Sequence, residues 1–257
     1  MRNKVPQVTF AFWIIKIAAT TLGETGGDAL SMTLNLGYAV STAIFLAFFV
    51  ATAATQIASS RLRRFLYWAV IVATTTVGTT TSDYLTRTAG FGYLWTSFIL
   101  FAGVLMVLGI WYFSLGSVNV NHITNRKAET FYWLTILTSN TLGTALGDCL
   151  ADTSGVGYEG GALVFAGALA LLLALYFFTN VSHVVLFWAA FILTRPLGAT
   201  LGDILTKPLN HGGLNLSRFT SSYAIGAFMI VFILLFTDRS EKEAALERRR
   251  QPCSPTP

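Results

Sequence analysis

The chain has 257 residues, of which 54% are hydrophobic and only 11% are charged, with a net charge of +5. A soluble domain normally carries about 25% charged residues, so the composition excludes an ordinary soluble globular protein. The mean hydropathy of +0.61 agrees with this conclusion. Four apolar runs approach the length of about 20 residues that crosses a bilayer, which predicts a membrane protein with several spans. They lie at 37–56, 92–114, 157–179 and 217–237.

Two acids interrupt the first apolar stretch, at about 9–30. It contains TTLGETGGDAL, in which Glu24 and Asp28 stand four residues apart. An acid in hydrocarbon costs roughly 2.5–3.5 kcal/mol on insertion scales, so such acids usually serve a function. The stretch returns three times further along the chain, as TTVGTTTSDYL, NTLGTALGDCL and RPLGATLGDIL. The aspartates of the four copies are Asp28, Asp83, Asp148 and Asp203, spaced by 55, 65 and 55 residues.

The repeat extends on both sides of this motif. A tryptophan stands fifteen residues before each aspartate and a glycine nine residues after it. Each copy has room for two spans, the first carrying the motif (about 9–30, 65–86, 130–150 and 184–206) and the second an apolar run. Copies with an even number of spans all point the same way in a membrane. The sequence therefore predicts an all-α polytopic protein of eight transmembrane helices, as four parallel two-helix repeats at about 9–56, 65–114, 130–179 and 184–237.

The basic residues predict the orientation. One transmembrane domain covers 1–237, and 238–257 is expected to be a partly disordered tail. The side that holds both termini has most of the lysines and arginines, whereas the other side has only Arg87, Lys207 and Arg218. Cytoplasmic loops carry the excess of positive charge, so both termini are expected in the cytoplasm and the protein in a bacterial inner membrane. The tryptophans are expected to anchor the spans at the membrane interface. They are Trp13, Trp68, Trp133 and Trp188.

The motif has two faces when placed on a helix, because positions i, i+4 and i+8 align. In the first copy one face holds Thr20, Glu24 and Asp28, and the adjacent face holds Gly23 and Gly27. Small residues four apart let helices approach closely in a membrane. We therefore expect the four motif helices to form a tight central cluster with the aspartates inside, surrounded by the plainer apolar helices.

The charges in the expected spans are unbalanced. The spans contain five acids but only two basic residues, Lys16 and Arg195, so their net charge is −3 if all are ionised. Carboxylates packed together then need a bound cation or bound protons. Oxygen ligands suit hard cations such as Mg²⁺, Mn²⁺ or Ca²⁺. Lys16 is expected as a counter-ion to a carboxylate, and Arg195 is expected to pair with Asp203 or with an acid of another repeat. The predicted metal ligands are Glu24, Asp28, Asp83, Asp148 and Asp203, with neutral oxygens from Thr20, Thr79, Asn140 and Thr144.

The fourfold motif, with tryptophan upstream and glycine and tyrosine downstream, resembles a bacterial family of repeat-containing integral membrane proteins of unknown function. A second similarity is to manganese and calcium exporters of the cation/proton exchanger type, whose helices carry Glu-x-Gly-Asp-Lys/Arg-Thr/Ser. Here the stretch from Glu24 to Asp28 has one residue more and no Lys/Arg-Thr/Ser after it. Only one of the four copies has the glutamate.

These observations predict a cation transporter, not an enzyme, that moves a divalent metal such as manganese in proton-coupled export. Its expected partners are the bilayer, an inorganic cation and protons, with no nucleic acid and no cofactor. The ion, the direction of transport and the oligomeric state stay open. The alternatives are a cation channel with a ring of acids, an intramembrane aspartyl protease, and a structural membrane protein. The protease is disfavoured because no motif has its Gly-x-Gly-Asp pattern.

Overall fold

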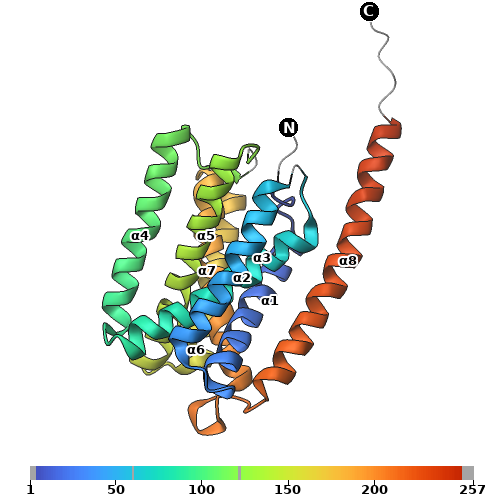
Figure 1. Ribbon diagram of the computed structural model, residues 1–257. Coiled ribbons are helices and arrows are strands. Elements are labelled where there is room, and N and C mark those ends of the chain that lie inside the picture. The colour runs from blue at the N-terminus through green and yellow to red at the C-terminus, as the bar shows by residue number, and fades with distance from the viewer. Residues whose placement is uncertain (1–3, 60, 121–122, 251–257) are drawn as a thin grey trace, which may run out of the picture.

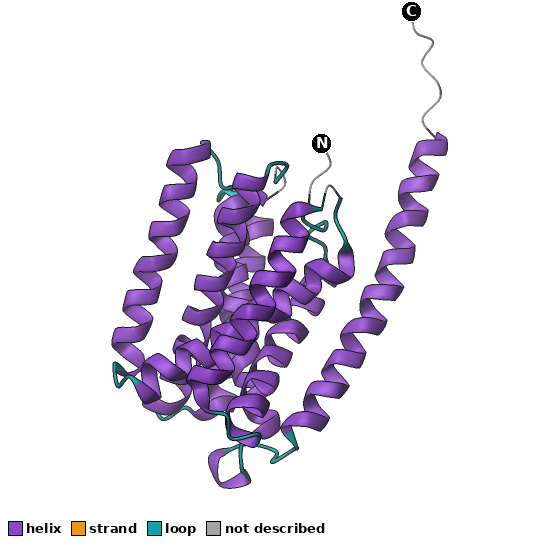
Figure 2. Ribbon diagram, viewed as in Figure 1, coloured by secondary structure: helices purple, strands orange, loops and turns teal. Residues whose placement is uncertain are grey.

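The computed structural model describes residues 4–59, 61–120 and 123–250, and every regular element within them is helical (Figure 2). Each repeat contributes one helix that carries the motif, called an inner helix below, and one apolar helix, called an outer helix. The inner helices are α1 (Phe10–Asp28), α3 (Arg64–Asp83), α5 (Arg126–Asp148) and α7 (His183–Thr206). The outer helices are α2 (Gly37–Ala58), α4 (Gly92–Leu115), α6 (Gly157–Phe178) and α8 (Arg218–Arg250).

The first three inner helices end in the same way. Directly after its aspartate each widens into one π-helical turn, a local geometry that is frequent at functional sites. These turns are η1 (Ala29–Thr33), η2 (Tyr84–Thr88) and η4 (Cys149–Thr153). The next helix then begins at a glycine with φ of 66° to 74°. Residues other than glycine rarely adopt this conformation, because their Cβ makes it unfavourable. The repeated downstream glycine of the sequence therefore marks the turn between the two helices of a repeat.

The fourth repeat departs from this pattern. Helix α7 ends at Thr206 without a π turn, and Pro208 follows two residues later. Proline has no N–H group to continue a helix and disfavours helical geometry in the preceding residue. The chain instead forms the short 3₁₀ helix η5 (Leu209–His211), and Leu214 and Leu216 donate backbone hydrogen bonds to Ile204 and Leu205. The segment between α7 and α8 is thus folded back against the end of α7.

The four inner helices form a closed ring. Helix α1 packs against α3 and α7, and α5 packs against the same two helices from the other side (Figure 1). The four helices run in the same direction, so the ring has an amino end, where they begin, and a carboxyl end, where the aspartates lie. This ring is the tight central cluster that the glycine pattern predicts.

The outer helices interlock the repeats. Each one packs mainly against the inner helix of the following repeat: α2 against α3, α4 against α5, and α6 against α7. Helix α8 completes the circle by packing against α1, and α4 and α8 stand at opposite sides of the bundle in Figure 1. A repeat is therefore not a self-contained helix pair, because its second helix packs mainly against the inner helix of the next repeat.

Within the described part of the chain, five helices are long and apolar enough to cross a membrane: α2, α4, α6, α7 and the part of α8 from Arg218 to Phe236. The inner helices α1, α3 and α5 are not apolar enough to meet this criterion, because they carry charged residues, threonines and glycines. The ring buries these residues. The start of α1 and the end of α8 lie at the same end of the bundle (Figure 1). Helix α8 continues to Arg250, so the part of the predicted tail from 238 to 250 is helical, and 251–257 lie outside the described residues.

Glycine allows the ring to be this narrow. A Cβ placed on Gly198 of α7 would lie 2.1 Å from Thr20 Oγ1 of α1, and one on Gly143 of α5 would lie 2.4 Å from Arg195 Cγ of α7. A Cβ placed on the equivalent glycine of α1, Gly23, would likewise lie 2.1 Å from Thr75 Oγ1 of α3. Real Cβ atoms do not approach other atoms this closely, so each helix contact requires glycine at this position.

Aromatic side chains close the amino end of the ring. Each inner helix contributes two neighbouring rings, and the eight form a continuous circle in which successive centroids are 5.1 to 6.2 Å apart. The hydroxyls of Tyr67 and Tyr132 are hydrogen-bonded to each other at 2.5 Å. The expectation of interface anchors is wrong for the tryptophans of this circle, because they pack between helices. The eight residues are Phe12, Trp13, Tyr67, Trp68, Tyr132, Trp133, Phe187 and Trp188.

Candidate cation-binding site

The motif residues meet inside the ring in layers, because residues four apart on each inner helix share a face. The layer of Glu24 also contains Thr79 and Thr144, and the layer of Asp28 contains the other three aspartates. Side chains in both layers are buried. The structure thus brings the acids of four distant sequence segments to the carboxyl end of one axis.

Arg195 lies fully buried at the centre of the ring and pairs with Glu24. Its Nη2 atom is 2.9 Å from Glu24 Oε2 and lies within 2.5 to 2.6 Å of the hydroxyl oxygens of Thr79 and Thr144. Thr79 also donates to Glu24 Oε2 at 3.2 Å. Of the partners that the sequence leaves open for Arg195, the structure therefore selects an acid of another repeat and not Asp203.

Lys16 lies one turn closer to the aromatic circle and is also fully buried. Its ammonium is 3.3 Å from Asn140 Oδ1 and 4.1 Å from the centroid of the Phe191 ring. Asn140 in turn donates to Thr74 Oγ1 at 2.9 Å. Among the described residues Lys16 forms no ion pair with a carboxylate, so the expectation of a carboxylate partner is corrected: an amide oxygen and a ring face stabilise it.

Three acids converge near Arg195. Glu24, Asp28 and Asp203 each place a carboxylate oxygen within 4.8 Å of the other two. All three side chains are buried, and neither carboxylate oxygen of Asp28 has a hydrogen-bond partner among the described residues. Buried polar atoms without a partner are rare and call for a ligand, an ion or a water molecule. We call these residues the three-acid group.

The other two aspartates form a separate pair. Arg87, in the π-helical turn η2, places Nε 3.3 Å from Asp83 Oδ1 and Nη2 3.1 Å from Asp148 Oδ2. One guanidinium thus bridges the acids of two neighbouring helices. Of the five predicted ligands, the structure brings Glu24, Asp28 and Asp203 together, whereas Asp83 and Asp148 share Arg87 and are not part of the three-acid group.

Two further cations reach the three-acid group from the carboxyl end. Lys207 Nζ lies 3.2 Å from Asp203 Oδ1 and 3.8 Å from Asp28 Oδ2, and Arg218 Nε lies 3.6 Å from Asp28 Oδ2. Together with Arg87, these residues bring three cations to the aspartates from outside the expected spans. The net charge of −3 counted over the spans alone therefore does not describe the site, because it left out basic residues that the fold brings to the aspartates.

The sequence contains a pattern that indicates contact with the aspartates for two of these three cations. Arg87 and Lys207 each stand four residues after a motif aspartate, one helical turn away on the same face. They were assigned to the loops because the apolar runs end before them. Arg218 begins α8 and reaches the site only through the packing of α8 on α1, so no local pattern points to it.

The predicted neutral ligands have other partners. Thr20 donates its hydroxyl to the backbone carbonyls of Ile17 and Thr194, which ties α1 to α7. Thr79 and Thr144 contact the Arg195 guanidinium, and Asn140 contacts Lys16. These side chains therefore hold the buried cations and the helices in place, and only Thr79 also touches an acid of the three-acid group.

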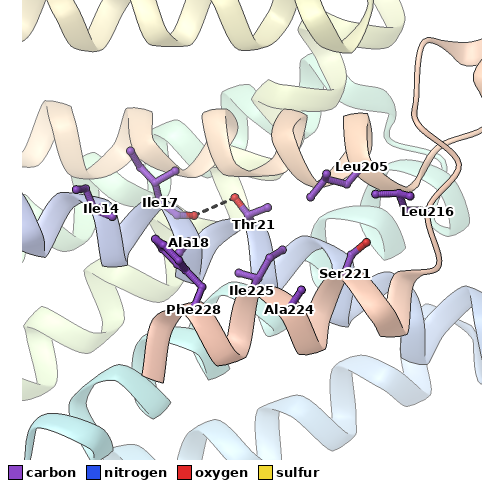
Figure 3. Close-up of a pocket in the computed structure, with 10 residues that line it drawn as sticks. All are labelled: Ile14, Ile17, Ala18, Thr21, Leu205, Leu216, Ser221, Ala224, Ile225 and Phe228. Atoms are coloured by element: carbon purple, nitrogen blue, oxygen red, sulfur yellow. Dashed lines mark hydrogen bonds between the residues drawn. The ribbon is translucent and has the colours of Figure 1, made fainter. Parts of the chain in front are cut away.

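An apolar pocket of about 540 Å³ lies outside the ring, between α1, α8 and the end of α7 (Figure 3). Ile14, Ala18 and Phe228 line it, and Thr21 uses its hydroxyl in a hydrogen bond to the Ile17 carbonyl. None of the described residues that line it is charged. The pocket is therefore unsuited to a cation and is separate from the three-acid group.

Fold and site together define an all-helical protein with membrane-type helices and four internal repeats around a buried, charged axis. The family model for the Repeat of Unknown Function (DUF347) matches the chain four times, at residues 11–61, 66–117, 131–182 and 186–241. The chain belongs to this family, and the four matches confirm the repeats predicted from the motif. No curated protein and no solved structure matches the chain, so the similarity to cation/proton exporters has no support from these comparisons.

Proposed function

We propose that the protein is a membrane carrier for a divalent cation such as Mn²⁺, and that the three-acid group binds the ion. The observation that supports the proposal is the convergence of Glu24, Asp28 and Asp203 within 4.8 Å, with no hydrogen-bond partner from the described residues for either oxygen of Asp28. Carboxylate oxygens are the ligands that hard divalent cations prefer.

The topology belongs to the same proposal. All eight helices cross the membrane as four parallel repeats, with the polar inner helices shielded by the outer ones. Exposed apolar side chains on α2, α4, α6 and α8 support this arrangement. The excess of basic residues at the amino end of the ring supports a cytoplasmic location of both termini in this proposal. The acids then lie near the outer face, where an exporter releases its ion.

The local charge fits a divalent ion if Lys207 and Arg218 turn away from the acids. Lys207 and Arg218 approach from the carboxyl end, and their side chains are 13% and 24% exposed, whereas Arg195 is fully buried. The three acids with Arg195 alone carry −2, which one divalent cation neutralises. Metal ligands take up protons when the metal leaves, so the same carboxylates couple metal release to proton uptake.

The buried cations favour a carrier over a channel. Arg195 and Lys16 both lie inside the ring, and aromatic rings fill its amino end. A continuous cation pore along this axis would have to pass two fixed positive charges in a region of low dielectric, which is unfavourable. A carrier exposes its site by moving helices and needs no such pore.

The test is binding of Mn²⁺ to purified protein together with metal accumulation in cells. Glu24→Gln and Asp28→Asn each remove one charge and keep the shape of the side chain. We expect each to weaken Mn²⁺ binding about tenfold or more, a loss of roughly 1.4 kcal/mol or more, and to reduce metal movement in parallel. Mg²⁺ and Ca²⁺ measured beside Mn²⁺ rank the ions.

Glu129→Gln is the matched control. Glu129 is as buried as Glu24 and pairs with one cation, Lys4, at 2.7 Å, but it lies at the start of α5, at the opposite end of the ring. Its replacement should leave Mn²⁺ affinity unchanged. The proposed function fails if Glu24→Gln and Asp28→Asn fold normally and bind and move divalent ions as the wild type does.

A further inference from the structure

Two cations bridge the ring of aspartates at equivalent positions. Arg87 and Lys207 each stand one turn after the aspartate of their own repeat, and each also reaches the aspartate of the next repeat around the ring. The equivalent positions of the first and third repeats hold Met32 and Asp152, so only every second repeat supplies a bridge. The four aspartates are thus divided into two pairs, each with one bridging cation.

The two bridges differ in strength. Arg87 uses two different nitrogens of a planar guanidinium, at 3.3 and 3.1 Å from its two aspartates. Lys207 has one ammonium, close to Asp203 at 3.2 Å but 3.8 Å from Asp28. Arginine is pre-organised for two-point contacts with carboxylates, whereas lysine is a strongly hydrated point charge on a flexible stem. The Lys207 bridge is therefore the one that opens more easily.

The surroundings of Lys207 allow its side chain to move away from the aspartates. Lys207 directly follows the end of α7, in extended backbone, so its side chain is not confined to a helical surface. Its ammonium lies 6.0 Å from the centroid of the Tyr158 ring, close to the limit of a cation–π contact. A small rotation toward Tyr158 and water would separate the ammonium from both aspartates.

We propose that Lys207 is a tethered cation that occupies the ion position between Asp28 and Asp203 and leaves it when a divalent cation binds. This inference rests on the proposed function and makes Lys207 a competitor that lowers the affinity for the metal ion. Asp28 supports this inference, since its buried carboxylate has charged neighbours but no hydrogen-bond partner in the described part of the chain, as expected for a ligand that exchanges one cation for another. In the Arg87 pair the bridge stays closed and serves the fold.

The experiment compares Mn²⁺ affinity of Lys207→Gln, Lys207→Met and Lys207→Arg with the wild type, using purified full-length protein. Loss of the competing charge in Lys207→Gln and Lys207→Met should raise affinity about tenfold or more, since a unit charge within 4 Å competes directly with the metal ion. Lys207→Arg should lower affinity, because a guanidinium would hold both aspartates as Arg87 does. Lys4→Gln, which removes a paired lysine at the other end of the ring, should change nothing.

The outcomes separate this inference from the proposed function. A purely structural salt bridge would lower thermal stability in Lys207→Gln and Lys207→Met without any gain in affinity. If the wild type binds Mn²⁺ and neither variant binds it more tightly, the tethered-cation role is wrong and the proposed function stands. If neither the wild type nor any Lys207 variant binds a divalent ion, the proposed function fails and the inference fails with it. Binding by the charge-neutral variants alone would support the inference directly.

Discussion

Replacing Gly198 by alanine is expected to remove most of the folded protein. The added Cβ would lie 2.1 Å from Thr20 Oγ1 and 2.9 Å from the backbone carbonyl carbon of the same residue, so α1 and α7 would have to separate. Overpacking of a tight interior costs about 1–3 kcal/mol even when side chains can adjust. Here the neighbour is partly backbone, and the ring transmits the displacement to the other helices. We therefore expect the upper end of this range or more for alanine, and a larger loss for Gly143→Leu or Gly198→Leu.

The measurement is folded yield by size-exclusion chromatography in detergent, followed by thermal unfolding. Gly167→Ala on α6 is the control, because no atom lies within 4 Å of its added Cβ. Alanine is favoured over glycine in a helix by about 1 kcal/mol, so this variant should be neutral or slightly more stable. Gly167→Leu serves the same purpose for the leucine variants. Equal tolerance at Gly198 and Gly167 would contradict the close packing of the ring.

Arg195→Gln is expected to produce the second large loss of stability, because it leaves the buried Glu24 carboxylate without its counter-charge. The pair is buried, with a distance of 2.9 Å between Arg195 Nη2 and Glu24 Oε2, and the guanidinium also contacts two threonine hydroxyls. Removing one partner of a buried ion pair costs about 3–5 kcal/mol, because the other charge stays buried without compensation. Arg218→Gln should cost much less, since Arg218 is partly exposed and its contact to Asp28 is 3.6 Å long.

A double-mutant cycle isolates this interaction. Glu24→Gln combined with Arg195→Gln leaves two neutral amides and should recover part of the stability lost in Arg195→Gln alone. The readout is the thermal unfolding midpoint of the four proteins in one detergent. Additive losses, with no recovery in the double variant, would show that Arg195 does not act as the counter-charge of Glu24.

The candidate site was only partly predictable from the sequence. The motif spacing placed Glu24 and Asp28 one turn apart on one face, and both lie in the three-acid group. The third member, Asp203, comes from the last repeat and meets them because the ring closes α7 onto α1. No local pattern states which repeats become neighbours. For the same reason the partner of Arg195 was left open, and Arg87, Lys207 and Arg218 were not counted with the acids.

The aromatic circle shows the same limit in the apolar part of the ring. The doublets of phenylalanine or tyrosine with tryptophan recur at the same distance before each aspartate, so their equivalence is visible in the sequence. Whether such residues face lipid or each other depends on the rotation of each helix in the ring. Helix rotation follows from the glycine contacts at the carboxyl side, which a single-helix pattern does not describe.

The sequence by itself determined that this is an all-helical, membrane-type chain of four repeats, because hydrophobic length and periodic motifs are local properties that survive without a partner. It also determined the close approach of the motif helices, since glycine at every equivalent position leaves room for nothing larger. The tertiary structure alone decided how each outer helix crosses to the next repeat, which acids converge and which cations pair with them. Those contacts join residues from opposite ends of the chain, and they depend on the closure of the ring, a property of all four helices together.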